Sequence, residues 1–129
     1  MKINEVNFRI KMSGEDLAVA VVQDYRSDKI LMVAFMNKEA LQKTVETGKM
    51  HYFSTSRAKI WLKGESSKHY QLVREVFIDC DGDALLFKVE QLGGACHKGY
   101  YTCFFRKFSD GKWEVFEKKV FEPSDIYGK

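Results

Sequence analysis

The sequence predicts a single mainly β domain, residues 1–129, with one capping helix, which is an α+β fold. Three observations lead to this fold class. The chain has only one Pro against ten Phe and six Tyr, and aromatic residues favour strands. Apolar or alternating runs recur along the chain, separated by turn residues. A single segment carries the start and stop signals of a helix. At 129 residues and 45% apolar composition, the chain can bury the core of one domain.

The first two strands are expected at residues 17–22 and 30–35, which are continuous apolar runs. The polar segment 24–29 separates them. The pattern predicts a hairpin that is buried on both faces.

The helix is expected from Lys38 to Thr47, because Asn37 can cap its start and Gly48 provides a stop. Its apolar stripe consists of Ala40, Leu41, Thr44 and Val45. A short helix with one apolar face is expected to cover a sheet.

The remaining segments are mainly strands. A basic, polar stretch at 57–68 interrupts them, and the dipeptides Gly82-Asp83 and Asp110-Gly111 are hairpin-turn signals. The expected strands are residues 50–54, 72–78, 84–92, 102–108 and 112–116.

Charge and hydropathy narrow the possible partners and compartment. The chain has no apolar run of about 18 residues, which argues against a membrane span. A net charge of +3 is too balanced for a dedicated nucleic-acid clamp. The N-terminal residues lack the apolar core of a secretory signal, so a cytoplasmic location is expected.

Three cysteines, Cys80, Cys96 and Cys103, stand near acids, glycines or a histidine. They could be small buried hydrophobic residues, which free cysteines often are. An odd count and a reducing compartment argue against a disulfide framework. The absence of a Cys-x₂-Cys pair argues against a zinc finger or a thioredoxin-like motif. Three thiolates on Zn²⁺ would leave one position open for a catalytic water.

Asp79, Asp81 and Asp83 alternate and would face one way on a strand. Three carboxylates repel one another unless a cation lies among them, and their oxygens suit Mg²⁺ or Ca²⁺. An EF-hand is excluded because Ala84 stands where that loop needs Gly. A solvated Asp-rich turn is the other interpretation.

Among the histidines, His97 lies beside Cys96 in a Gly-rich segment and is the candidate for a general acid or base. A satisfied structural histidine is the alternative for His97 and for His69, while His51 lies in an expected strand and is taken as structural. In the basic stretch, cationic and hydroxyl side chains could bind phosphate, and Trp61 could support a flat base. The alternative is a solvated face. The candidate substrate-binding residues are Arg57, Trp61, Lys63, Ser66, Ser67 and His69.

The segments that carry these candidate residues, together with several others, resemble the phosphoribosyl-AMP cyclohydrolase family over nearly the whole chain. The combination of DCDGD and ACHKG with a following cysteine is highly specific. The similar stretches are LMVAFMNKEAL (31–41), TGKMHYFSTSR (47–57), WLKGESS (61–67), DCDGDALLFKVEQ (79–91), ACHKGYYTCF (95–104) and EPSDIYG (122–128).

The resemblance implies the third step of histidine biosynthesis, in which water opens the adenine ring of 1-(5-phosphoribosyl)-AMP at the N1–C6 bond. It implies one Zn²⁺ per subunit on Cys80, Cys96 and Cys103, and one Mg²⁺ per subunit on Asp79, Asp81 and Asp83. It also implies a β pseudo-barrel capped by a helix, and a homodimer that shares its zinc ligands between subunits. Lys68 departs from the glycine that many members carry there.

Two other functions remain open from the residues. One is a non-catalytic β module in which zinc holds a dimer together and the basic stretch binds a nucleotide or RNA. The other is hydrolysis of a different purine nucleotide, because the contacts that select a substrate do not follow from the sequence.

Overall fold

The structure is a computed structural model, in which residues 3–127 are described. Strands dominate it, and one helix of ten residues packs beside them, which confirms the mainly β, α+β class. The elements are β1 (Ile10–Met12), β2 (Glu15–Asp24), β3 (Ile30–Met36), α1 (Lys38–Thr47), β4 (His51–Ser54), β5 (Lys59–Leu62), β6 (Gln71–Ile78), β7 (Ala84–Gln91), β8 (Arg106–Ser109), β9 (Lys112–Val115) and α2 (Ser124–Tyr127).

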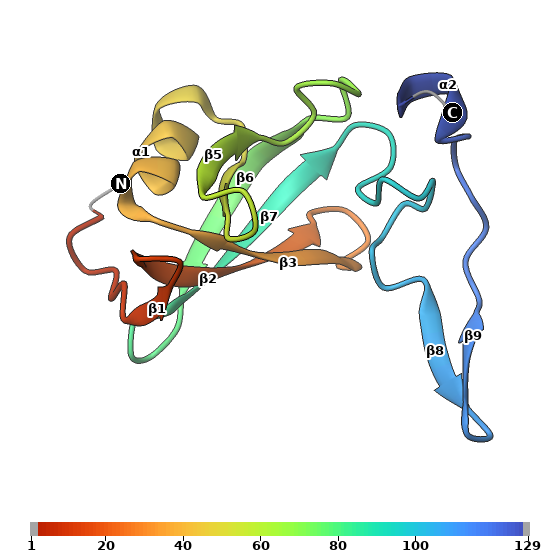
Figure 1. The fold of residues 1–129 in the computed structure, drawn as a ribbon, viewed down its shortest axis with the longest axis horizontal. Helices are drawn as coiled ribbons and strands as arrows, with labels where there is room; N and C mark the ends of the chain where they lie inside the picture. Colours follow the sequence, from red (N-terminus) through yellow and green to blue (C-terminus); the bar gives the residue numbers. More distant parts are fainter. Residues whose placement is uncertain (1–2, 128–129) are drawn as a thin grey trace.

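Strand β2 is the centre of the main sheet (Figure 1). It pairs antiparallel with β3, which confirms the expected hairpin, and parallel with β7, which the sequence did not predict. Strand β6 extends the sheet beyond β7, and β1 pairs with the start of β2. In the described part of the chain the strands form separate sheets rather than a closed barrel, so the expected pseudo-barrel is not closed within one chain.

The first hairpin is not fully buried on both faces. Ala18, Ala20 and Val22 of β2 are fully buried, whereas Val33 of β3 is 49% exposed. The prediction of burial on both faces is therefore wrong for the single chain. Apolar continuity in the sequence did not distinguish an exposed valine from a buried one.

Helix α1 has the bounds that the sequence predicts. The Asn37 side chain accepts a hydrogen bond from the Ala40 N–H, and Gly48 adopts a left-handed φ of 73°. Ala40, Leu41 and Thr44 are buried as the helix packs beside β3, β4 and β5 (Figure 1). The helix thus covers the core as expected.

Strand β5 lies within the basic stretch that the sequence analysis left without a strand. It pairs antiparallel with β4, setting Tyr52 opposite Trp61. The pairing buries Tyr52 completely and leaves Trp61 half-buried. Only three apolar residues, 60–62, stand between Lys59 and Lys63, so the sequence gives a weak signal for this short strand.

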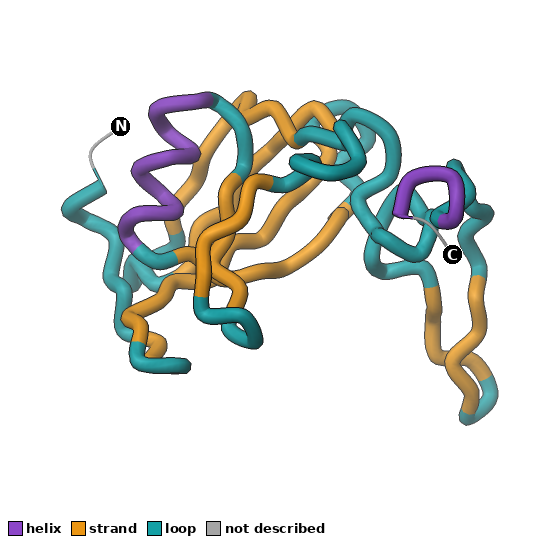
Figure 2. Tube along the Cα trace, turned by 45° about the horizontal axis from the view of Figure 1, so that its top comes forward, coloured by secondary structure: helices purple, strands orange, loops and turns teal. Residues whose placement is uncertain are grey.

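The last hairpin forms around Asp110-Gly111, as predicted, with both residues at positive φ. It projects away from the main sheet (Figures 1 and 2). Its first strand begins at Arg106 rather than Thr102. The reason is that Thr102 donates its hydroxyl to the Ile30 carbonyl at 2.7 Å, and the Cys103 N–H binds the Leu31 carbonyl at 2.7 Å. These bonds tie 102–103 to the start of β3.

No helix in the described range 3–127 has the length and apolarity needed to cross a membrane.

Candidate functional site

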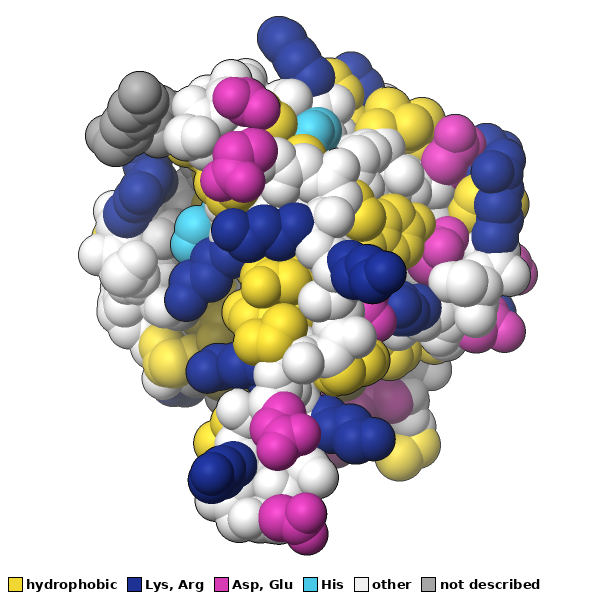
Figure 3. Space-filling view, turned by 90° about the vertical axis from the view of Figure 1, so that its right-hand side faces the viewer, with side chains coloured by type: hydrophobic (Ala, Val, Ile, Leu, Met, Phe, Trp, Pro, Cys, Tyr) yellow, Lys and Arg dark blue, Asp and Glu magenta, His cyan; other side chains and the backbone are white. Residues whose placement is uncertain are grey.

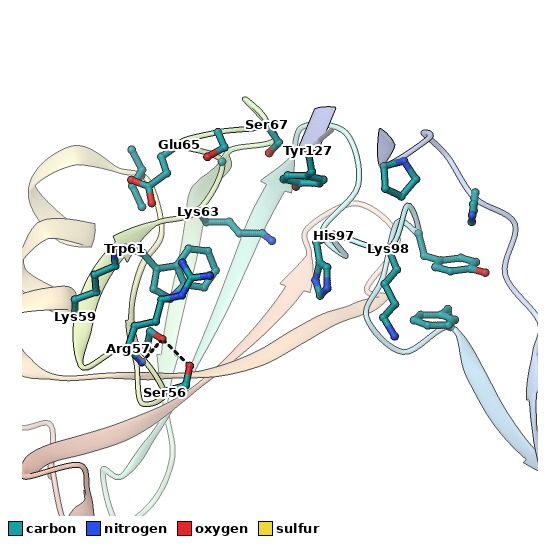
Figure 4. Close-up of a pocket in the computed structure, with 18 of the residues that line it drawn as sticks. Ser56, Arg57, Lys59, Trp61, Lys63, Glu65, Ser67, His97, Lys98 and Tyr127 are labelled. Atoms are coloured by element: carbon teal, nitrogen blue, oxygen red, sulfur yellow. Dashed lines mark hydrogen bonds between the residues drawn. The ribbon is translucent and has the colours of Figure 1, made fainter. Parts of the chain in front are cut away.

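A cavity of about 1120 Å³ lies between the β4–β5 hairpin, the loop after β5, the loop after β7 and the C-terminal segment (Figure 4). Six of the residues selected from the sequence line it: Arg57, Trp61, Lys63, Ser66, Ser67 and His97. They belong to segments up to 40 positions apart that the fold brings to one hollow.

The loop that follows β7 carries Cys96 and His97 to this cavity. The N–H groups of Ala95 and Cys96 donate to the carbonyls of Tyr101 and Tyr100, at 3.0 and 3.1 Å. The Gly99 N–H donates to the Cys96 carbonyl, which closes a tight turn. His97 lies on this turn, exposed and facing the cavity (Figure 4).

Lys63 connects the cavity to two of the three cysteines. Its ammonium group donates to the Ala95 carbonyl. Burial lowers the pKa of Lys63, while the nearby thiols of Cys103 and Cys96 act in the opposite direction. Burial, and then the neighbouring Cys96, raise the pKa of the Cys103 thiol to about 11, although the residue as a whole keeps surface exposure. The structure therefore places Cys96 and Cys103 side by side next to Lys63.

Cys80 is far from the other two cysteines. It lies exposed on the loop between β6 and β7, whereas Cys96 and Cys103 follow the other end of β7. An eight-residue strand is about 26 Å long, and the two ends lie on opposite sides of the fold in Figure 1. The three expected thiolate ligands do not meet within the described part of one chain.

The three aspartates do meet. One carboxylate oxygen from each of Asp79, Asp81 and Asp83 lies within 4.8 Å of the others. They converge on the β6–β7 loop rather than on a strand face, so the expected strand geometry is wrong although the expected clustering holds. An all-oxygen donor set of this kind fits a hard cation such as Mg²⁺.

Arg9 is paired with this acidic loop, which the sequence analysis did not anticipate. Its guanidinium lies 2.6 Å from the Asp83 carboxylate and 3.3 Å from that of Asp81. The hydrogen bond between the two carboxyls raises the pKa of Asp81, and the same bond together with Arg9 lowers the pKa of Asp83. The Asn7 N–H also binds the Gly82 carbonyl at 2.7 Å. The N-terminal segment thus organises the loop.

His69 is placed outside the cavity lining. Its Nδ1 lies 3.2 Å from the Gly94 carbonyl oxygen, and its ring packs edge-on against Phe121. His69 therefore contacts the back of the loop that carries Cys96 and His97. The Nδ1 atom of His51 lies 2.8 Å from the Lys49 carbonyl oxygen, and the backbone N–H of His51 donates to the Thr44 hydroxyl. Both contacts are in keeping with a structural residue.

Within the segment 54–67, the cavity is also lined by Ser54, Ser56, Lys59, Leu62, Gly64 and Glu65. Beyond this segment, the cavity has further lining residues that the sequence did not single out. They come from the loop before β8, from β8 and from the C-terminal segment. Only Lys98, next to His97, carried a sequence signal, since the others depend on non-local packing. These residues are Lys98, Tyr100, Phe105, Arg106, Lys119, Pro123 and Tyr127.

Comparison with known proteins points to one family. The sequence model of the phosphoribosyl-AMP cyclohydrolase family matches residues 32–105. A protein of that name from Methanothermobacter thermautotrophicus is 57% identical over 125 residues, covering 95% of this chain and 91% of the relative. Proteins of the same name from Methanosphaera stadtmanae and Chlorobaculum parvum are 54% and 50% identical, over 95% and 93% of this chain and 97% and 88% of the relatives.

Proposed function

This chain belongs to the phosphoribosyl-AMP cyclohydrolase family, and we propose that it opens the adenine ring of 1-(5-phosphoribosyl)-AMP by hydrolysis, as the third step of histidine biosynthesis. Water adds at C6 and the N1–C6 bond breaks, which yields the formimino aminoimidazole carboxamide ribotide. The family membership supports a hydrolase that acts on a cyclic amidine. The cytoplasm is the proposed location, since three unpaired thiols suit a reducing compartment.

The separation of Cys80 from Cys96 and Cys103 is the observation that most directly supports a zinc site shared between two subunits. One end of β7 holds the cavity, His97 and two thiols, and the other end holds Cys80 and the three aspartates. Neither end alone provides the expected ligand set. A homodimer that sets the β6–β7 loop of one subunit against the cavity of the other would complete the zinc site and bring the carboxylates close to it.

In this dimer, Cys96 and Cys103 of one subunit and Cys80 of a second copy would hold Zn²⁺. The ion would supply a Lewis acid that lowers the pKa of a water in the open fourth position. Thiolates are the donors that this ion prefers, and the adjacent Lys63 ammonium favours the charged form of Cys103. The aspartate loop would hold Mg²⁺ through oxygen donors.

The cavity residues have separate tasks in this mechanism. His97 is exposed on the cavity side of its turn, where it can accept and return a proton as N1 becomes the leaving nitrogen. Trp61 offers a half-buried aromatic face for the base. Arg57, Lys63, Ser66 and Ser67 provide cationic and hydroxyl donors for phosphate oxygens.

Subunit mixing tests the shared site. Cys80→Ser and Cys96→Ser are each expected to be inactive and to bind little zinc. In a mixed dimer, one site combines the intact Cys96 and Cys103 of one subunit with the intact Cys80 of the other. An equal mixture that is dissociated and reassociated should regain about a quarter of the wild-type turnover and zinc content, because about half of the dimers are mixed and each has one intact site.

A second pair of variants controls for nonspecific rescue. Cys96→Ser mixed with Cys103→Ser should regain nothing, since each subunit then lacks a ligand of the same half-site. Recovery in this control, or none in the Cys80→Ser mixture, would overturn the shared site. Ring opening is followed by the change in ultraviolet absorbance.

A further inference from the structure

The cavity concentrates positive charge. A single acidic residue, Glu65, lines it together with six basic side chains, and Lys and Arg surround an apolar hollow on the face shown in Figure 3. The basic residues are Arg57, Lys59, Lys63, Lys98, Arg106 and Lys119. The whole chain, by contrast, has 21 basic and 18 acidic residues. The excess is therefore local to this cavity.

Within residues 3–127 of one chain, none of these six cations forms an ion pair with a carboxylate. The ion pairs in this range are formed by basic residues outside the cavity lining, which are Arg9, Lys11, Lys29, Arg74 and Lys88. Like charges around one hollow repel each other and raise the local concentration of anions. The arrangement favours an anionic ligand with more than one negative group.

Five of these basic residues belong to two walls of the cavity. Figure 4 shows Arg57 on one side of the cavity and Lys98 on the other. Arg57 and Lys59 belong to the β4–β5 hairpin. Lys98, Arg106 and Lys119 belong to the wall formed by the loop after β7, strand β8 and the C-terminal segment. We call this second group the distal wall.

The distal wall is a built structure rather than a set of loose side chains. Tyr100 and Phe105 stack with ring centroids 3.9 Å apart and an interplanar angle of 6°. The Arg106 guanidinium lies 5.4 Å from the Phe105 ring centroid, which holds it while its N–H groups stay available to an anion. Lys119 pairs through its backbone with Tyr100. Arg106 and Lys119 are thereby set beside one aromatic stack, and Lys98 precedes Tyr100 by two residues on the same wall.

We infer that Lys98, Arg106 and Lys119 form a phosphate subsite that selects a nucleotide with a second phosphoribosyl group over a nucleoside monophosphate. The inference rests on the proposed function for the identity of the substrate. That substrate carries one phosphate on each of two riboses, attached to different sides of the same base. A cavity of about 1120 Å³ exceeds the roughly 300–1000 Å³ of common ligand pockets. The β4–β5 wall takes one phosphate and the distal wall takes the other.

Charge-removing pairs of substitutions test the two walls separately. The distal variant is Lys98→Gln with Arg106→Gln, and the hairpin variant is Arg57→Gln with Lys59→Gln. The control is Lys107→Gln with Lys118→Gln, which removes the same charge from two exposed residues outside the lining. The measurements are KM and kcat for phosphoribosyl-AMP, and the dissociation constant of AMP by calorimetry.

Both wall variants should raise KM for phosphoribosyl-AMP by about tenfold or more, the effect of losing a hydrogen bond to a charged group. Only the hairpin variant should weaken the binding of AMP, because AMP carries a single phosphate and lacks the second phosphoribosyl group that the distal wall selects. Weakening of AMP by the distal variant alone would overturn the inference. The control should change neither constant by more than about twofold, as expected for exposed charges. A distal variant with the KM of the control overturns the inference. Equal weakening of AMP by both walls overturns it as well.

A binding measurement separates this inference from the proposed function. If the wild-type protein does not turn over phosphoribosyl-AMP, the proposed function fails. Ribose 5-phosphate and AMP are then titrated into the same three variants. If the distal variant alone loses binding of ribose 5-phosphate, the inference of a phosphate subsite stands. If the distal variant binds both compounds as the wild type does, the inference is overturned.

Discussion

The imidazole ring of His69 and the phenyl ring of Phe121 meet edge to face, with their centroids 4.7 Å apart, against the backbone of Gly93 and Gly94. A Cβ atom on Gly93 would lie 2.4 Å from the His69 ring, and one on Gly94 would lie 2.7 Å from the Phe121 ring. The two rings thus hold the loop that carries Cys96 and His97 from behind. His69 therefore supports this loop from behind, and its expected role in substrate binding stays a prediction.

Phe121→Ala should loosen this loop more than it destabilises the sheet. The variant loses an aromatic pair and part of the burial of one ring, a cost of about 2 kcal/mol. Phe116→Ala is the matched control, because Phe116 is 56% exposed. Denaturant unfolding should show the stability difference, and competition with a chelator should show weaker zinc binding only for Phe121→Ala. Equal zinc affinities in the two variants would contradict a positioning role.

Gly99→Ala should be more damaging than Gly111→Ala. Both glycines have positive φ, 104° and 78°, so both substitutions strain the backbone. A Cβ on Gly99 would also lie 2.6 Å from the Phe121 carbonyl oxygen, whereas one on Gly111 has nothing within 4 Å. Their difference in unfolding free energy therefore measures how closely the C-terminal segment approaches the loop, and we expect at least about 1 kcal/mol. Equal losses of unfolding free energy in the two variants would show that the C-terminal segment moves away from the added Cβ atom at little cost.

Local signals explain which parts of the fold the sequence predicts correctly. Helix α1 is specified by its own residues, with Asn37 at one end and Gly48 at the other. The turn at Asp110-Gly111 depends on two adjacent residues that tolerate positive φ. In both cases the interactions that determine the element lie within the element itself.

The errors arise where distant segments decide the structure. The parallel pairing of β2 with β7 joins segments about 65 positions apart, and no turn signal marks it. Strand β8 starts late because Thr102 and Cys103 bind the start of β3 instead of continuing the hairpin. The residue type of the three cysteines suggests a zinc site, which stays a prediction, whereas the separation of Cys80 depends on the length of β7.

Arg9→Gln should increase the affinity of the aspartate loop for Mg²⁺. The Arg9 guanidinium contacts carboxylate oxygens of Asp81 and Asp83 that a cation would use. Removing this competitor favours the metal, by about fivefold at most, because exposed ion pairs are weak. Lys11→Gln, which breaks the exposed pair with Asp16, is the control. Calorimetric titration of metal-free protein with Mg²⁺ gives both affinities. Weaker binding in Arg9→Gln would mean that Arg9 orders the loop for the metal.

Tyr101→Phe should change how stability depends on pH. The Tyr101 hydroxyl donates to the Asp24 carboxylate at 3.0 Å, and burial followed by this bond raises the pKa of Tyr101 to about 12. In the unfolded chain the pKa is about 10, so the unfolded state loses its proton first. The stabilisation from this group is complete below pH of about 10 and is lost as the pH rises toward 12.

At pH 8 the wild type should therefore be more stable than Tyr101→Phe by about 1 kcal/mol, from the hydrogen bond. Between pH 10 and about 12 the gap should narrow, since only the wild type loses this contribution. Denaturant unfolding at a series of pH values measures this gap in unfolding free energy. Tyr127→Phe is the control, because it removes the phenolic hydroxyl of an exposed residue. A gap that stays constant or widens would show that the bond to Asp24 does not hold the Tyr101 proton, and that the 100–103 segment is anchored chiefly by its bonds to β3.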